Sequence, residues 1–156
     1  MIKLLLNSFL LWLVCLAVSV PAFGADYVAN RDGTVTDTPH GLMWQRADDG
    51  VERNWRDAGK YCENLELAGK TDWRLPLVNT LAALIKPANS PMVPAAFSIR
   101  PSYYWSASAS LNNNQSAKYV NFFYGHTYAY SKDNTYYVIC VRNPSTGRAD
   151  KKPGVS

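Results

Sequence analysis

The chain has 156 residues, which is enough for one domain and short for two. Its 16 Lys and Arg residues exceed its 12 Asp and Glu residues, for a formal net charge of +4. The excess of positive charge is mild, and the Lys and Arg residues form neither a basic helix nor a basic stripe. The sequence therefore argues against a nucleic-acid partner.

The first 24 residues have the pattern of a secretory signal peptide. A positively charged start, Met1–Lys3, precedes an apolar run over Leu4–Val20, and small residues stand before Ala25 for cleavage. An uncleaved N-terminal anchor is the alternative, and a lipoprotein is disfavoured because the residue before Cys15 is too large. The rest of the chain has no run of the ~20 apolar residues that span a bilayer. We therefore expect no membrane span after cleavage, and a periplasmic, secreted or cell-surface protein of a Gram-negative bacterium.

The segment after the signal peptide is typical of short strands joined by turns. Thr34–Thr36 and Leu42–Trp44 are β-prone runs. The Asp32-Gly33 pair predicts a tight turn, because glycine supplies the positive φ that such turns require. The acidic and amide residues here lack the ligand spacing of an EF-hand loop, so calcium is the weaker interpretation.

A helix is predicted to follow these strands. Asn54 is a good N-cap, and Asp57 places a negative charge in the first turn. We expect Gly69 to end this helix. Its apolar stripe is formed by four residues at helical spacing: Trp55, Ala58, Cys62 and Leu65.

A second, shorter helix is predicted to begin at Pro76, since proline is tolerated in the first turn of a helix. Pro87 should end it, and the proline-rich segment over 87–102 is expected to be an ordered loop. The apolar positions of this helix are Leu77, Leu81, Leu84 and Ile85.

The remaining elements are predicted to be strands. Tyr103–Ser108 forms one, and two more form a hairpin around Gly125. The last strand, Thr135–Asn143, has apolar residues at both odd and even positions. It is therefore expected to be central and buried on both faces. The fold class is therefore α+β, with the first and last strands pairing to bring the termini together.

Two cysteines remain after removal of the signal peptide, Cys62 and Cys140. Export to an oxidising compartment makes a disulfide the expected state for such a pair. Metal binding by two isolated cysteines is the alternative. A bridge would close a long loop, for which chain entropy predicts ~4 kcal/mol of stabilisation.

Several stretches in order carry a resemblance to a known family. They are DGTVTDTPHGLMWQ, then NWRDAGKYCENLELAGKTDWRLP, then YWSASAS, YVNFFYG and YYVICVRN. They resemble the bacterial DUF1566 family, the domain that forms the C-terminal part of the Legionella collagen-like adhesin. The resemblance covers a domain over residues 25–143, which leaves residues 144–156 as a tail expected to be basic and disordered.

The resemblance implies a C-type-lectin-like fold, with two helices flanking a small twisted antiparallel sheet and a loop-rich upper face. Relatives of the family bind glycans, including sulfated polysaccharides, as parts of surface adhesins. Leu77 and Thr80 depart from the family pattern, which commonly has a small polar residue and a glutamate there. No collagen-like repeat precedes the domain, so the oligomeric state stays open.

The stretch DWRLP lies at the joint between the two predicted helices. Formylglycine-generating enzymes have a similar RLP before a helix on a related fold, but their chemistry needs an accessible, reactive cysteine pair. Here both cysteines are expected in a structural bridge, and no other catalytic motif is present. We therefore predict no enzyme activity, no cofactor and no metal site. The residues assigned to structural roles are Trp55, Trp73, Arg74, Pro76 and Trp105.

The C-terminal half is rich in tyrosines and amides, which suit sugars. Aromatic rings stack on the apolar faces of pyranoses, while amides bond to hydroxyl groups. The alternative is that many of these tyrosines only build a sheet. The calcium-dependent tripeptides of animal lectins are missing, so binding should not use a metal bridge. The candidate ligand-binding residues are Asn112, Asn113, Asn114, Gln115, Lys118, Asn121, His126, Tyr128, Tyr130 and Lys132.

The functional hypothesis is an exported, non-catalytic binding domain that recognises glycan, including sulfated or acidic polysaccharide, or another extracellular ligand at the bacterial envelope. Lys118, His126 and Lys132 would supply affinity for sulfate or carboxylate. The alternative is a structural or assembly partner of an envelope machine such as a pilus or secretion system. An enzyme related to formylglycine generation is the third hypothesis.

Overall fold

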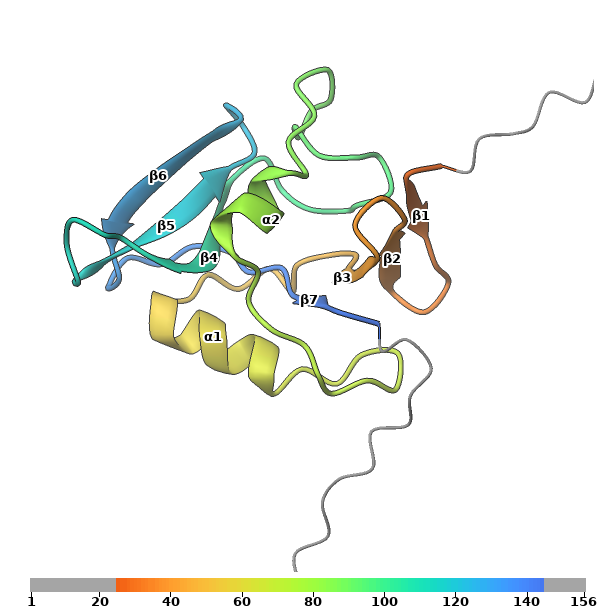
Figure 1. The fold of residues 1–156 in the computed structure, drawn as a ribbon, viewed down its shortest axis with the longest axis horizontal. Helices are drawn as coiled ribbons and strands as arrows, with labels where there is room; N and C mark the ends of the chain where they lie inside the picture. Colours follow the sequence, from red (N-terminus) through yellow and green to blue (C-terminus); the bar gives the residue numbers. More distant parts are fainter. Residues whose placement is uncertain (1–24, 145–156) are drawn as a thin grey trace, which may run out of the picture.

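The structure, a computed structural model, describes residues 25–144 as an α+β fold with two helices, two antiparallel sheets and one disulfide (Figure 1). The α+β prediction is confirmed, but the expectation of a single sheet is wrong. The predicted signal peptide, and the predicted tail beyond residue 144, lie outside the described residues. Within 25–144, no helix has both the length and the apolar character that crossing a membrane requires.

The first sheet has the strand order β1-β2-β3-β7, with β1 at Tyr27–Ala29, β2 at Thr34–Asp37, β3 at Leu42–Gln45 and β7 at Val141–Arg142. Gly33, at φ +84°, makes the predicted turn between β1 and β2. The expectation that the first and last strands pair is wrong. β7 pairs with β3, so β1 and β7 lie at opposite edges of the sheet.

Helix α1, Trp55–Glu63, begins as predicted, because the Asn54 side chain accepts a hydrogen bond from the backbone N–H of Asp57 at 2.9 Å. The prediction that Gly69 ends it is wrong, since the helix stops at Glu63. Gly69, at φ +66°, instead helps form a tight turn that is closed by two backbone hydrogen bonds between Leu67 and Lys70.

Helix α2 covers Val78–Ala82, shorter than predicted. Pro76 lies before the helix and not at its start, because its carbonyl accepts a hydrogen bond from Ala107 of the next strand at 2.7 Å. The N-cap is Leu77, which is 55% exposed and so does not belong to the core stripe. A side chain from outside the helix, Ser108, accepts a hydrogen bond from the Val78 N–H at 3.0 Å, so one of the free N–H groups of the first turn has a partner on β4.

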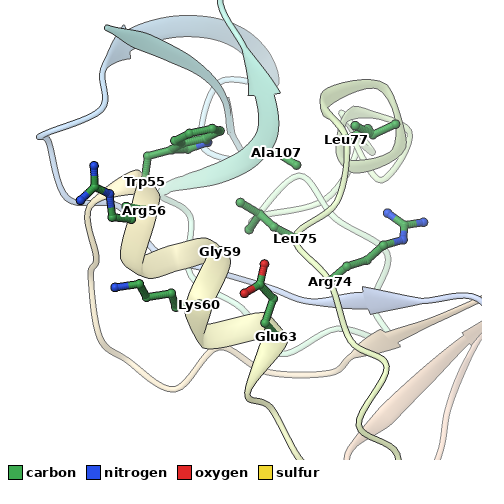
Figure 2. Close-up of a pocket in the computed structure, with 9 residues that line it drawn as sticks. All are labelled: Trp55, Arg56, Gly59, Lys60, Glu63, Arg74, Leu75, Leu77 and Ala107. Carbon is green, nitrogen blue, oxygen red and sulfur yellow. The ribbon is translucent and has the colours of Figure 1, made fainter. Parts of the chain in front are cut away.

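The second sheet has the order β4-β5-β6, with β4 at Tyr103–Ala109, β5 at Ser116–Asn121 and β6 at His126–Ser131. The predicted hairpin around Gly125 joins β5 to β6. α2 packs against all three strands on one face, while α1 lies beside β4 and next to the extended segment that leads into α2 (Figures 1 and 2). The outer strand, β6, is a free edge.

The segment before β7 runs between the two sheets. Tyr137 exchanges backbone hydrogen bonds with β4, and Cys140 accepts one from Gln45 of β3. The side chains from Val138 to Val141 are fully buried, which confirms the predicted burial on both faces. The prediction of one long strand is wrong, because the segment changes partner from one sheet to the other. Only Val141 and Arg142 form a regular strand, β7.

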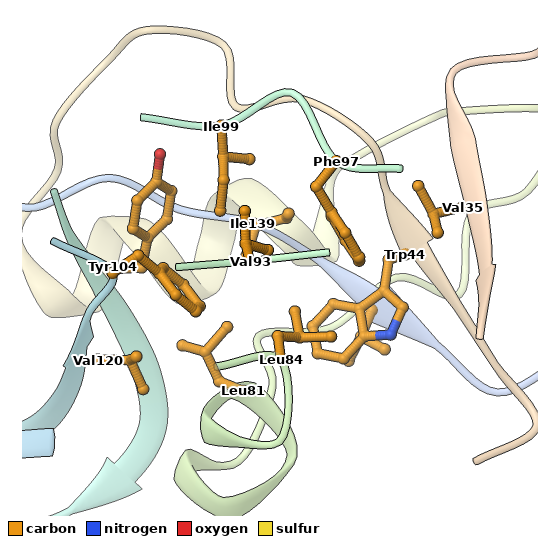
Figure 3. Packing of buried hydrophobic residues seen from close by; sticks show 12 residues of the cluster. Val35, Trp44, Leu81, Leu84, Val93, Phe97, Ile99, Tyr104, Val120 and Ile139 are labelled. Carbon is orange, nitrogen blue, oxygen red and sulfur yellow. The ribbon is translucent and has the colours of Figure 1, made fainter. Parts of the chain in front are cut away.

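The core consists of two clusters of buried side chains. In the first, Trp44, Leu81, Leu84 and Ile139 converge between the sheets and α2 (Figure 3). The loop over 87–102 has no helix or strand of its own and contributes buried apolar residues to this cluster. The second cluster lies under α1. There Cys62 and Cys140 form the predicted disulfide, with their Cα atoms 5.5 Å apart.

Candidate functional site

One face of the β4–β5–β6 sheet is aromatic. The register places Trp105 opposite Tyr119, and Tyr119 opposite Tyr128, so their side chains share this face. Tyr130 lies two residues beyond Tyr128 and therefore points the same way. Tyr136 packs on Tyr119 from the segment between the sheets, with ring centroids 4.8 Å apart. We define the tyrosine face as Tyr103, Tyr119, Tyr128, Tyr130 and Tyr136.

The most exposed rings of this face lie at the free edge of the sheet. Trp105, on the same face, is fully buried, and it packs on Tyr136 with centroids 4.5 Å apart. Tyr128 and Tyr130 on β6 are 53% and 56% exposed. The buried rings therefore hold the inner side of the face rigid, while the outer tyrosines offer ring surface to solvent.

The inner tyrosines stay protonated far into the alkaline range. Burial raises the pKa of Tyr136 to about 12, with further contributions from the neighbouring tyrosine hydroxyls. Burial also raises the pKa of Tyr119. At neutral pH the tyrosine face is thus an uncharged surface of rings and hydroxyl groups, each hydroxyl able to donate and accept hydrogen bonds.

Two nitrogen-bearing side chains stand at opposite ends of the tyrosines on β6. The His126 ring lies 6.1 Å from that of Tyr128. Lys132 follows Tyr130 at the same strand parity, and its Nζ lies 4.5 Å from the centre of the Trp55 ring. Because six strand residues span ~20 Å, His126 and Lys132 flank the exposed tyrosines and do not meet.

Two predicted ligand-binding residues do not join this face. Lys118 is opposite Ala129 in the register and lies on the other face, where it lines a small pocket with Val78 and Asn79 of the α2 segment. Asn121 is only 4% exposed, and its Oδ1 accepts hydrogen bonds from two backbone N–H groups of the β5–β6 turn. Lys118 therefore does not share a face with His126 and Lys132.

The predicted loop Asn112–Gln115 connects β4 to β5 and is fully exposed. The Asn113 side chain accepts a hydrogen bond from the Gln115 N–H, and Lys132 Nζ donates to the Asn114 carbonyl at 2.6 Å. Gln115 and Lys132 line a polar pocket of about 550 Å³ beside Trp55. The structure thus brings the amide loop and Lys132 together at one end of the tyrosine face.

A larger groove of about 700 Å³ lies on the other side of Trp55, between α1 and the extended segment 74–77 (Figure 2). We call it the α1 groove. Its apolar lining comes from both walls, with Trp55 and Gly59 on α1 and Leu75 and Leu77 opposite them. Charged lining residues are Arg56, Lys60, Glu63 and Arg74.

Sequence reasoning assigned Trp55 only to the core and gave Gly59 no role. The Trp55 indole N–H is indeed anchored, donating to the Ser106 carbonyl at 2.8 Å, but the residue also lines the polar pocket and the α1 groove. One signal was available in the sequence. A glycine in the middle of a predicted helix weakens that helix, so its presence there suggests that the position needs the space that a side chain would fill.

The joint residues singled out in the sequence lie between the two helices. Trp73 is buried in the second core cluster, as is Trp105, and Pro76 is buried just before α2. Arg74 exchanges two backbone hydrogen bonds with Val141, while its guanidinium donates to the Asn143 amide oxygen at 2.9 Å. The side-chain partner of Arg74 is thus a neutral amide and not a carboxylate.

The acidic side chains of the first hairpins bond to their own turns. Asp32 accepts hydrogen bonds from the N–H and hydroxyl of Thr34, and the buried Asp37 accepts one from the Trp44 indole. In the described range 25–144, no three His, Cys, Asp or Glu side chains gather as a metal site would require.

The comparisons with known proteins agree with the features above. No curated protein matches the chain. The sequence profile of the Lcl C-terminal domain matches residues 33–142, a range that contains both helices, the disulfide and all but the first strand. The chain therefore belongs to the Lcl C-terminal domain (DUF1566) family, which indicates an extracellular, adhesin-like domain.

Proposed function

We propose that this protein is a non-catalytic, C-type-lectin-like binding domain that recognises glycan at the bacterial envelope through its tyrosine face. The observation that carries the proposal is the pair Tyr128 and Tyr130, each more than half exposed on the same side of an edge strand. Single exposed aromatic side chains are common, but neighbouring ones that form a patch rimmed by polar residues are typical of binding surfaces. Family membership supports an extracellular role for that purpose.

The geometry suits a sugar chain lying along β6. Residues two apart on a strand are separated by ~7 Å, so one oligosaccharide can stack on both exposed rings. Stacking on aromatic faces removes the apolar side of each pyranose from water. The hydroxyls of the tyrosine face then remain available to the sugar hydroxyls, and the exposed amides of Asn113 and Gln115 continue this surface at the Lys132 end.

The charges at the ends of the face favour acidic glycans. Lys132 is a cation at one end, and His126 adds a second positive charge at the other when it is protonated. A polysaccharide with sulfate or carboxylate groups can contact both ends while its rings stack on Tyr128 and Tyr130. Because these contacts lie at the surface, salt should weaken them.

The test is binding of the purified, oxidised protein to sulfated, acidic and neutral glycans at two salt concentrations, with calcium and with chelator. We expect salt-sensitive, chelator-insensitive binding to the acidic panel. Tyr128→Ala and Tyr130→Ala should each weaken it roughly tenfold, or ~1.4 kcal/mol. Tyr124→Ala is the matched control, because Tyr124 is a 61% exposed tyrosine outside the tyrosine face.

A second control is Lys118→Ala, on the opposite face of the same sheet. Equal binding by wild type and both tyrosine variants would show that the face is not the site. A loss confined to Lys118→Ala would move the site to the α2 side. No binding to any glycan would reject the proposal and favour an assembly partner at the envelope.

A further inference from the structure

The α1 groove contains two residues that are unfavourable for the local fold. Gly59 lies in the middle of α1, where glycine costs ~0.5–1 kcal/mol relative to alanine. A Cβ added at this position would meet no atom within 4 Å, so packing does not require a glycine there. The absent side chain leaves the wall of the groove open (Figure 2).

Leu77 is the second such residue, on the facing wall. It occupies the N-cap of α2, where leucine is among the poorest choices, and makes no capping hydrogen bond. Its side chain is 55% exposed beside the groove. Residues that break local rules without a packing benefit concentrate at functional sites, and here two of them face each other across one groove.

The charged side chains around the groove favour an acidic occupant. Arg56 has no ion-pair or hydrogen-bond partner among residues 25–144, and Lys60 approaches Asp57 only at 3.8 Å, with both side chains exposed. Arg74 is bonded to a neutral amide. Glu63 is the single carboxylate in the lining, so three cations against one anion leave an excess of +2.

The backbone of the wall opposite α1 adds a preference for a peptide. Residues 74–77 are extended, and neither the N–H nor the C=O of Leu75 has a hydrogen-bond partner in the described part of the chain. Unpaired backbone groups of an extended segment are the groups that a second extended chain can pair with.

We propose that the α1 groove binds an extended acidic peptide segment of a partner protein, with one apolar side chain seated between Trp55 and Leu77. Acidic side chains beside this anchor pair with Arg56, Lys60 and Arg74. The α1 groove adjoins the Lys132 end of the glycan surface, because Trp55, Arg56 and Lys60 also line the polar pocket there, whereas Gly59, Leu75 and Leu77 line the groove and not that pocket. The protein's own sequence over 145–156 does not supply this occupant, because it carries Arg148, Lys151 and Lys152 against Asp150.

The experiment is selection of a random 12-residue peptide library, displayed on phage, against the purified exported protein. The readout is the sequence of the enriched peptides and their affinity, as synthetic peptides, for two variants. Gly59→Phe projects a ring into the open space of the groove. Gly59→Ala is the matched control, since it adds only a methyl group and favours the helix.

We expect enriched peptides with an apolar residue flanked by Asp or Glu. They should bind Gly59→Ala like wild type, and Gly59→Phe and Arg56→Ala at least about tenfold more weakly. Thermal unfolding should show that all three variants are folded. Absence of enrichment, enrichment without acidic residues, or equal affinity for Gly59→Phe and wild type would overturn the proposal. Displacement of the peptide by an acidic glycan would instead assign the groove to the sugar.

Discussion

At the scale of single residues, two of the charged side chains inside the fold bond to partners distant in sequence. Arg142 on β7 is 4% exposed, and its guanidinium donates two hydrogen bonds to Asp72, at 2.7 and 3.1 Å. Asp48 is similarly buried and accepts from the Tyr104 hydroxyl at 2.7 Å. Neither partner could be chosen from sequence, because 70 residues separate the first pair and 56 the second.

The Asp72–Arg142 pair leads to a prediction about stability. Asp72→Ala should lower the free energy of unfolding by about 1–3 kcal/mol, because it leaves a buried guanidinium without its anion. The estimate is below that for a fully buried pair, since Asp72 is 55% exposed. Urea unfolding at pH 7 measures the change, and Glu66→Ala, which removes an exposed carboxylate nearby, should have little effect.

The same pair should make the free energy of unfolding depend on pH. The hydrogen bond from Arg142 holds the pKa of Asp72 below its usual range. A carboxylate with a lowered pKa stabilises the fold above the pKa of the unfolded state, near 4, and this stabilisation is lost as the pH falls through the folded pKa. The difference in stability between wild type and Asp72→Ala should therefore shrink below about pH 4. A difference that is constant with pH would contradict the charge interaction.

At the scale of elements, α1 illustrates how local signals define one end of a helix better than the other. Asn54 bonds to the Asp57 N–H, and its own amide donates to the Asp57 carboxylate at 2.9 Å, so the start depends on two residues close in sequence. The end at Glu63 depends on how residues 64–70 turn back toward Trp73, whose indole donates to the Lys70 carbonyl.

The N-cap gives the second prediction. Asn54→Ala should lower the free energy of unfolding by about 1 kcal/mol, because the Asp57 N–H loses its acceptor. Asn54→Ser should recover most of this loss, since a serine hydroxyl can accept the same bond. Asn64→Ala at the other end of α1 is the matched control, because the cap there uses the backbone N–H of Asn64. An equal cost for Asn54→Ala and Asn64→Ala would show that the cap bond contributes nothing specific.

At the scale of the whole molecule, the segment 135–142 links the parts of the fold. It bonds to β4, then to β3, and carries the cysteine that binds α1. The disulfide therefore ties α1 to the segment that runs between both sheets. Loss of this covalent link should affect the entire fold, because the linked segment contacts both sheets and α1.

The third prediction concerns the bridge. Reduction of the wild-type protein should lower the free energy of unfolding by about 4 kcal/mol, the chain-entropy estimate for a bridge between residues 78 apart. Guanidinium unfolding with and without a reductant measures it. The Cys62→Ala, Cys140→Ala double variant should be somewhat less stable than the reduced protein, since it also loses two buried sulfur atoms. A change below about 1 kcal/mol on reduction would contradict the prediction.

The candidate site was predictable only in part, for a geometric reason. Strand parity was sufficient to put Tyr128 and Tyr130 on one face, because side chains alternate along any strand. Parity within one strand says nothing about the neighbouring strand, so the sequence could not show that Lys118 and His126, both candidate ligand-binding residues, lie on opposite faces of the sheet. Asn121, another candidate ligand-binding residue, is buried, and its side chain accepts the hydrogen bonds that shape the β5–β6 turn.

The signals contained in short stretches of chain were sufficient for the α+β class, the hairpins at Gly33 and Gly125, the start of α1 and the identity of the disulfide partners. Each rests on backbone preferences, on side-chain periodicity, or on there being only two candidate cysteines. Tertiary structure alone decided the division into two sheets, the change of partner along residues 135–142, and the α1 groove. These features depend on which segments pair across long distances, and pairing is determined by the packing of the whole core.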